Sequence, residues 1–270
     1  MTRGTEKFRA AIAADRLVLC MATNHARTPD FPYMVEAAGF DAFYVDTEHY
    51  PYSVETASML CTVALATEVT SFVRVPNHDA KHISCMLDGG ASGIIVPHVK
   101  SAVEARAIVE AARFPPLGRR GMAGPNSVTA FRAYGAGQSV ARLDDNVLLV
   151  PMLESVEAIE AADDIAAVEG IDVLLVGSGD LTLELGIPGQ VDHHDVIDAF
   201  SRVGAACRRH GKILGVAGVR DDPVLMEKLV GFGARFLIAG SDTGYMIAAA
   251  RNSSAQLRRF ERKDVATQAS

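Results

Sequence analysis

The sequence lacks the features that define several other classes of protein. It has four cysteines in 270 residues and no Cys-x-x-Cys pair, which argues against a zinc ribbon or a redox pair and favours buried, reduced thiols. It has no run of about 18 apolar residues, which excludes a membrane-spanning helix. Nothing in the first residues resembles the apolar centre of a signal peptide, so we expect a cytoplasmic protein.

Basic residues and phosphate-binding glycines are scarce as well. Lys and Arg number 26 against 33 Asp and Glu, and the net charge of −7 argues against a nucleic-acid partner. The turn after the first apolar run reads Ala22-Thr23-Asn24-His25-Ala26. It contains no Gly-x-Gly-x-x-Gly, which argues against a Rossmann-type sheet that binds a dinucleotide.

Short apolar runs alternate with segments of helical periodicity along the whole chain. The runs lack polar alternation, which is typical of parallel strands covered on both faces. Eight of them are candidate strands: Leu17–Thr23, Ala42–Asp46, Ser71–Val75, Gly93–Pro97, Val147–Met152, Val173–Val176, Ile213–Val216 and Phe236–Ala239. The helices expected between them include Val54–Ala66, Ala102–Ala112, Val156–Val168, Val196–His210 and Asp222–Phe232.

Eight such strand–helix units predict an α/β fold, a (β/α)8 TIM barrel. We expect one domain over residues 1–270, with an N-terminal helix at 1–16 and the end of a C-terminal helix and a tail at 253–270. Phe114–Leu143 interrupts the rhythm with three prolines and five glycines. Loops of this length are usually functional or disordered. The polar tail is expected to fray at Ala266–Ser270.

Ionisable residues follow the ends of several candidate strands, where TIM barrels carry their active sites. Glu154 and Asp180 follow neighbouring strands. The ends of neighbouring strands lie near each other, so these two carboxylates must either take up a proton or hold a cation between them. A hard divalent cation such as Mg²⁺ or Mn²⁺ suits these oxygen ligands. In the alternative interpretation, each carboxylate caps the helix that follows it.

Three further groups lie at strand ends. His49 follows a buried strand, with Asp46 three residues earlier, and is either a general base oriented by Asp46 or by another carboxylate, or a solvated loop histidine. Arg74 lies in an apolar strand and must meet an anion, which is either a substrate oxygen or an internal salt-bridge partner. Gly177-Ser178-Gly179-Asp180 opens a helix, and is either a carboxylate- or phosphate-binding turn or a tight connection.

Taken in order, these residues resemble one family, the metal-dependent (class II) pyruvate aldolases typified by 4-hydroxy-2-oxoheptane-1,7-dioate aldolase. Their superfamily includes the citrate lyase β subunit. The resemblance runs from about Val18 to Ala249. Its markers are Gly39-Phe40-Asp41, Asp46-Thr47-Glu48-His49, Val73-Arg74-Val75-Pro76, Leu87-Asp88-Gly89-Gly90, Pro115-Pro116-Leu117-Gly118-Arg119-Arg120-Gly121, Glu154, Glu169-Gly170-Ile171-Asp172, Gly177-Ser178-Gly179-Asp180-Leu181 and Gly240-Ser241-Asp242.

The resemblance implies a lyase that cleaves or forms 4-hydroxy-2-oxo acids through a pyruvate-type enolate and an aldehyde, in aromatic or sugar acid catabolism. The implied metal ligands are Glu154 and Asp180, for Mg²⁺ or Mn²⁺ first and Co²⁺ or Zn²⁺ next. His49 would be the base, and Arg74 would hold the C2 oxygen and stabilise the enolate. Backbone N–H groups near Ser178 and Gly179 would bind the substrate carboxylate.

Two further expectations come from the resemblance. Asp46 would position the base or the aldehyde, and Asp88 would reach the active site of a neighbouring subunit. The resemblance also implies a homo-oligomer, a trimer or a hexamer, whose subunits exchange the last helix.

The sequence also departs from the family pattern and leaves alternatives open. Thr47 replaces a glycine, Met152 stands where many members have Gln, and His98 occupies a position that is more often apolar. His98 either reads an unusual acceptor or fills space. The same residues could serve a 2-oxo acid decarboxylase or a Claisen-type acyl-CoA lyase. No lysine occurs between Lys100 and Lys212, so no Schiff-base lysine follows strands five and six.

Overall fold

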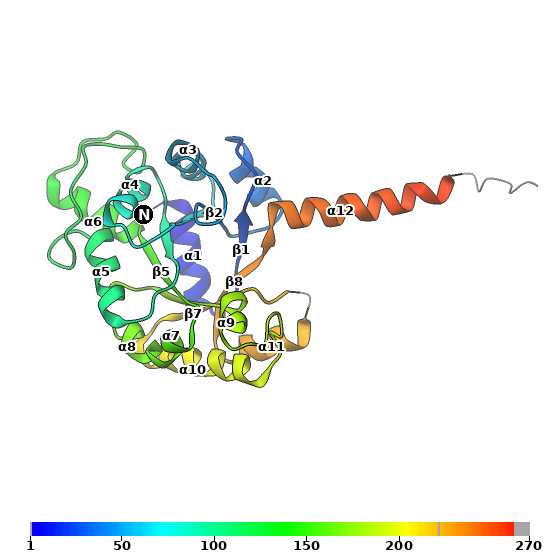
Figure 1. Cartoon of the computed structure of the whole chain (residues 1–270). Coiled ribbons are helices and arrows are strands. Elements are labelled where there is room, and N and C mark those ends of the chain that lie inside the picture. The colour runs from blue at the N-terminus through cyan, green and yellow to red at the C-terminus, as the bar shows by residue number, and fades with distance from the viewer. Residues whose placement is uncertain (1, 221, 262–270) are drawn as a thin grey trace, which may run out of the picture.

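Eight parallel strands close into a barrel in the computed structural model, which describes residues 2–220 and 222–261 (Figure 1). Each strand pairs with the next along the chain, and the last pairs with the first. The TIM barrel and its eight strands are therefore confirmed, with strand ends shifted by no more than two residues. The strands are β1 Val18–Thr23, β2 Ala42–Asp46, β3 Thr70–Arg74, β4 Gly93–Val96, β5 Leu148–Leu153, β6 Val173–Gly177, β7 Ile213–Ala217 and β8 Ala234–Ser241.

Helices surround the barrel, and several begin at a serine whose hydroxyl caps the first turn. Ser53, Ser101 and Ser155 each accept a hydrogen bond from the backbone N–H three residues later. The helix expected at Val156–Val168 is instead two short helices that meet at Ala161. The helices are α1 Arg3–Ala13, α2 Phe31–Ala37, α3 Val54–Ala64, α4 Ala80–Asp88, α5 Ala102–Ala112, α6 Ala136–Asn146, α7 Val156–Glu160, α8 Ala162–Ala166, α9 Ser178–Glu184, α10 His194–His210, α11 Pro223–Gly231, α12 Asp242–Leu257 and the 3₁₀ helix η1 Arg258–Phe260.

Side chains at alternate strand positions fill two separate cores. On β2, Ala42 and Tyr44 point into the barrel, whereas Phe43 and Val45 pack against the helices outside. The inward row on β5 is Leu148, Val150 and Met152. Continued by one more step of two residues, these rows reach Asp46 on β2 and Glu154 beyond β5. The period of the strands thus places polar side chains over the C-terminal mouth of the barrel.

The helix α1 closes the opposite end of the barrel. The ring of Phe8 packs against those of Phe72 and Phe236, with centroids 6.0 and 5.9 Å apart, and all three side chains are buried. Gly4 permits this approach, because a Cβ there would come within 2.5 Å of the carbonyl oxygen of Val69. Ligands can therefore enter the barrel only from the C-terminal ends of the strands.

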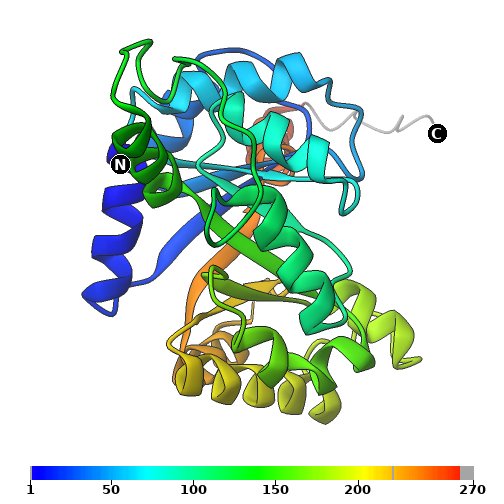
Figure 2. The ribbon, with the colours of Figure 1, turned by 90° about the vertical axis from the view of Figure 1, so that its left-hand side faces the viewer.

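The long segment after α5 lies at the closed end, where the αβ loops of a TIM barrel run (Figure 2). Its last part forms α6, which the sequence interpretation had treated as loop. Arg113 donates to the carboxylate of Asp172 at 3.1 Å and to two backbone carbonyls, and Arg120 donates to Asp88 at 2.6 Å. The segment therefore contributes nothing to the mouth of its own barrel.

The helix α12 extends away from the barrel, and none of its side chains is buried (Figure 1). Met246 and Leu257 on it, and Phe260 just after it, are largely exposed. None of the helices within residues 2–220 and 222–261 is long and apolar enough to cross a membrane. The expected fraying at Ala266–Ser270 concerns residues outside the described part of the chain.

Asp242, at the start of α12, holds the loop that follows β1. Its carboxylate accepts hydrogen bonds from the backbone N–H groups of Asn24, His25 and Ala26 at 3.0, 2.9 and 2.7 Å. Partial burial opposes its charge, but these bonds and one from Thr243 outweigh burial and lower the pKa of Asp242 below its usual value of about 3.8. The folded protein therefore stabilises the charged form of the Asp242 carboxylate.

A pH dependence of stability follows from this lowered pKa. Because the folded pKa lies below the unfolded one, the stabilisation by Asp242 is complete above about pH 4 and is lost as the pH falls through the folded value. We expect Asp242→Asn to destabilise the protein more at pH 6 than at pH 3, measured by urea unfolding at both values. An equal loss at both pH values would contradict this assignment.

Candidate active site

Asp46 and Arg74 meet at the mouth of the barrel because β2 and β3 place them in register. The two residues are Cα partners in the parallel pairing. Nε and Nη2 of Arg74 donate to the two carboxylate oxygens of Asp46, at 3.0 and 2.6 Å. Asp46 is 1% exposed and also accepts from the backbone N–H groups of Glu48 and His49. This bidentate pair fixes the plane of the guanidinium over the cavity.

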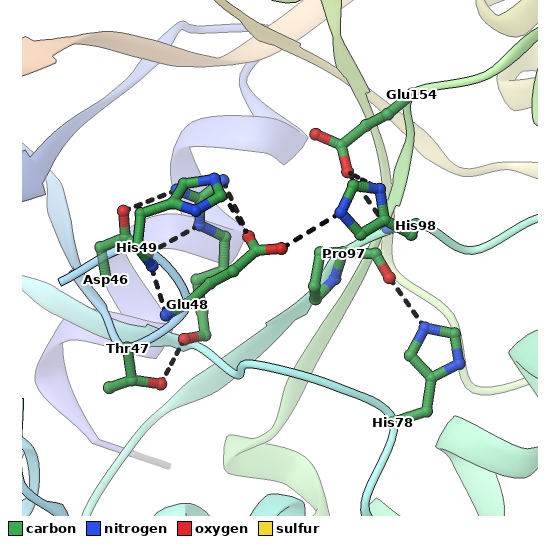
Figure 3. Close-up of polar contacts among 9 residues, drawn as sticks. Asp46, Thr47, Glu48, His49, His78, Pro97, His98 and Glu154 are labelled. Atoms are coloured by element: carbon green, nitrogen blue, oxygen red, sulfur yellow. Dashed lines mark hydrogen bonds and ion pairs between the residues drawn. The ribbon is translucent and has the colours of Figure 1, made fainter. Parts of the chain in front are cut away.

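Glu48 is a second acid beside Arg74. Its carboxylate lies 3.3 Å from Nη1 of Arg74 and 3.2 Å from Nε2 of His98 (Figure 3). Burial disfavours the charge on Arg74, but the hydrogen bond to Asp46 and the nearby acidic groups outweigh burial and raise the pKa of Arg74. After these contacts, one N–H on each of Nη1 and Nη2 remains for a ligand. Arg74 is therefore a fixed, permanently charged donor at the cavity wall.

Glu154, Asp180 and His98 form the other half of the site. One oxygen of each carboxylate and one ring nitrogen of His98 lie within 4.8 Å of one another. His98, whose φ is +55°, directs both its backbone N–H (3.1 Å) and its ring Nδ1 (3.4 Å) at the same oxygen of Glu154. The nearby ring of His78 contacts the carbonyl of Pro97 at 2.7 Å. Polar contacts thus run from Asp46 through Arg74, Glu48 and His98 to Glu154 (Figure 3).

The chemistry of Glu154 and Asp180 fits the ligand set of a divalent cation. Burial raises the pKa of Glu154, and the charge of Asp180 raises it further, although contacts with His98 and the charge of Arg74 lower it in part. A cation between the two carboxylates would relieve both of the effects that disfavour ionisation. The neighbouring Gly177 leaves room for this arrangement, because a Cβ there would come within 2.5 Å of Glu154 Oε1. The donor set therefore fits the expected metal.

The turn at the start of α9 presents backbone N–H groups to the same cavity. Ser178 is buried and donates its hydroxyl to the carbonyl of Ala217 at 2.9 Å, so its side chain holds the turn. A Cβ added to Gly179 would meet nothing within 4 Å, so its backbone is open to ligands. Gly218, with φ of +88°, lies against Ser178, and a Cβ there would approach its Oγ to 2.3 Å. Turns of this kind at a helix start can bind an anion, and this one lines the cavity next to the carboxylate pair.

A cavity of about 240 Å³ joins these groups. His49 lines it with a half-exposed side chain, and its Nε2 lies 3.7 Å from Glu48. The ring of His49 forms no hydrogen bond with the carboxylate of Asp46. The oxygens of that carboxylate accept hydrogen bonds from Arg74 and from the backbone N–H groups of Glu48 and His49. Glu48 is thus the acid that lies beside the histidine ring. The other lining residues include Tyr44, Ile95, Met152, Leu175 and Arg220.

Asp88 lies apart from this cavity. It ends α4 on the closed side of the barrel, where it pairs with Arg120. A role for Asp88 in a neighbouring subunit's site stays a prediction.

The sequence analysis missed roles for two residues, Glu48 and Arg220. Glu48 lies two residues after Asp46. Because side chains alternate along a strand, this spacing could have predicted that Glu48 continues the inward row. Arg220 lies on the loop after β7, three residues beyond the strand, and no periodicity predicts its direction.

A TIM barrel with two converging carboxylates and a fixed arginine at its mouth has the groups that a metal-dependent lyase uses. A family model described as HpcH/HpaI aldolase/citrate lyase matches residues 24–249. The chain belongs to this family.

Individual relatives agree over nearly their whole length. A 4-hydroxy-4-methyl-2-oxoglutarate aldolase of Hapsidospora irregularis is 39% identical over 256 residues, which cover 92% of this chain and 94% of that protein. One of Chaetomium globosum is 34% identical over 253 residues, 93% and 94% of the two chains. The crystal structure of an HpcH/HpaI aldolase from Desulfitobacterium hafniense superposes with a TM-score of 0.86, at 32% identity and 93% and 96% coverage.

The predicted resemblance, the fold and the enzyme class are confirmed by these comparisons. The chain is an aldehyde-lyase of the metal-dependent aldolase type. The identity of the ion and the role of each residue go beyond them.

Proposed function

We propose that this enzyme binds Mg²⁺ or Mn²⁺ through Glu154 and Asp180 and makes or breaks the C3–C4 bond of a 4-hydroxy-2-oxo acid. The observation that carries the proposal is the convergence of these two carboxylates at the end of a cavity that Arg74 and Gly179 also line. When bound, the cation supplies Lewis-acid polarisation of the 2-oxo group. The two fungal relatives are named for a derivative of 2-oxoglutarate, a substrate of this class.

Each of the remaining steps belongs to a residue of the chain. The free N–H groups of Arg74 bind the C2 oxygen, whose negative charge grows as the enolate forms, and they cost no reorganisation because Asp46 and Glu48 hold the guanidinium. The backbone N–H groups at Ser178–Gly179 bind the C1 carboxylate and so orient C3.

Proton transfer falls to His49. In cleavage, its ring accepts the proton of the C4 hydroxyl as the C3–C4 bond breaks; the electron pair of that bond becomes the enolate, the aldehyde leaves, and the proton is returned to C3 to give the 2-oxo acid. In synthesis the ring accepts the C3 proton of the 2-oxo acid and returns it to the new alkoxide. Glu48 lies 3.7 Å from the His49 ring and positions it, which is the role that the resemblance implied for Asp46.

We further infer that α12 packs against a second copy of the chain. Its exposed Met246 and the neighbouring exposed Leu257 and Phe260 leave apolar surface that the barrel does not cover. A homo-oligomer, trimer or hexamer, built on an exchanged last helix accounts for this surface. Sedimentation of the whole chain and of a chain ending before α12 tests it: loss of the oligomer on truncation is expected.

Enolate formation is tested by exchange of the methyl protons of pyruvate in D₂O, followed by NMR. We expect exchange with Mg²⁺ or Mn²⁺, no exchange after EDTA treatment, and full recovery when the metal returns. A heat-denatured sample with the same metal is the control for exchange in solution. Absence of exchange with every divalent metal tested would refute the proposal, because all versions of the reaction pass through this enolate.

A further inference from the structure

Arg220 is a second cationic residue at the cavity and lies across the barrel from Arg74. Arg74 ends β3, whereas Arg220 follows β7, and these two strands are opposite each other in an eight-strand barrel. Both side chains line the same cavity. Between β7 and Arg220, Gly218 turns the chain with φ of +88° and Val219 is buried, which anchors the loop. Gly218 and Val219 thus lead the chain to Arg220, whose own side chain is exposed.

The two arginines differ in their partners. Two carboxylates, those of Asp46 and Glu48, surround Arg74. Within residues 2–220 and 222–261, no carboxylate forms an ion pair with Arg220 and no group accepts a hydrogen bond from it. Its charge nevertheless reaches across the mouth: burial raises the pKa of Tyr44 on β2, and the charges of Arg74 and Arg220 both oppose that rise.

A charge count shows which ligand this arrangement favours. Arg74 with Asp46 and Glu48 carries a net charge of about −1, and Glu154 with Asp180 carries about −2, which a divalent cation cancels. Without Arg220, a substrate with two carboxylates would enter a cavity that already repels its second charge. With Arg220 the cavity gains a guanidinium that no carboxylate within residues 2–220 and 222–261 pairs with, and a carboxylate matches its donor fork.

We propose that Arg220 binds a second carboxylate on the acceptor half of the substrate, so that the preferred substrates are dicarboxylic 4-hydroxy-2-oxo acids. This inference rests on the proposed function. In the addition, a C3 proton leaves pyruvate, C3 bonds to the carbonyl carbon of the acceptor, and the acceptor oxygen gains a proton. Arg220 neither gives nor takes a proton; it holds the acceptor by its carboxylate.

The test compares two acceptors with the same donor. With pyruvate saturating, kcat/KM is measured for glyoxylate, which has a carboxylate, and for acetaldehyde, which has none. We expect Arg220→Gln to lower the glyoxylate-to-acetaldehyde ratio by about 10- to 100-fold, the usual size of a lost charge-assisted contact. Arg220→Lys keeps a cation and should retain most of the ratio. Arg16→Gln, an exposed arginine in the turn before β1 at the closed end, should leave the ratio unchanged.

Three outcomes would overturn the inference. An unchanged ratio in Arg220→Gln means that Arg220 does not read the acceptor. An equal loss with both acceptors, with a raised KM for pyruvate, means that Arg220 binds the pyruvate carboxylate instead. An equal drop of the ratio in the Gln and Lys variants means that charge is not what selects glyoxylate. If the unaltered enzyme fails to exchange pyruvate protons, the proposed function fails, and the inference fails with it.

Discussion

Glu154→Gln and Asp180→Asn are each expected to abolish stoichiometric binding of Mn²⁺ and to slow aldol cleavage by about a thousandfold or more. Both changes keep the size of the side chain, so the buried position of Glu154 stays filled. They remove one of the two negative charges that converge at the mouth of the barrel. A single carboxylate leaves a divalent cation bound mainly by water, and its affinity falls accordingly.

The measurement is a Mn²⁺ titration followed by EPR, with circular dichroism to verify the fold. Glu157→Ala is the matched control, because Glu157 is an exposed acid three residues after Glu154 that has no part in the cavity. Full Mn²⁺ occupancy in both site variants would show that the ligands are elsewhere. The geometry of the mouth would then need a different chemical explanation.

Arg74→Lys is expected to slow the exchange of pyruvate methyl protons by about 10²- to 10³-fold while leaving the affinity for Mn²⁺ nearly unchanged. Arginine serves Asp46 with two parallel bonds, contacts Glu48, and still has donors for a ligand. A lysine ammonium is a single point of charge with three donors, and it cannot keep both acids and a C2 oxygen at once.

Lysine is a sharper probe here than alanine. Arg74→Ala would leave Asp46 and Glu48 without their cation, and breaking such a buried pair costs about 3–5 kcal/mol of stability. Loss of activity in that variant would mix unfolding with chemistry. If Arg74→Lys exchanges pyruvate protons at the rate of the unaltered enzyme, the guanidinium does not stabilise the enolate.

Much of the fold and half of the site could be predicted from sequence because both follow from local periodicity. Parallel strands buried on both faces appear as apolar runs, and the eight runs matched the eight strands. Strand ends in a TIM barrel converge, so Arg74, Glu154 and Asp180 were predicted at one cavity without knowledge of any contact. The structure brings all three to that cavity.

The remaining features depend on contacts between distant segments, which periodicity does not encode. Asp46 or another carboxylate was expected to orient the histidine base; Asp46 is hydrogen-bonded to Arg74, and Glu48 is the carboxylate that lies next to His49. His98 seemed as suited to filling space as to reading a substrate; it bridges Glu48 and Glu154 through a left-handed backbone conformation that no pattern indicates. The proline- and glycine-rich segment after α5 was expected from its length to be either functional or disordered, and its place at the closed end follows from contacts that the sequence does not reveal.

The aromatic plug of Phe8, Phe72 and Phe236 has a kinetic consequence. A tunnel with two openings would let the two reactants enter independently. A cavity that is open at one end only favours a fixed order of entry. If the keto acid binds at the carboxylate pair, as proposed, we expect it to enter before its reaction partner and the aldehyde to depart first after cleavage. Steady-state analysis should therefore find an ordered mechanism in which pyruvate is the last product to leave.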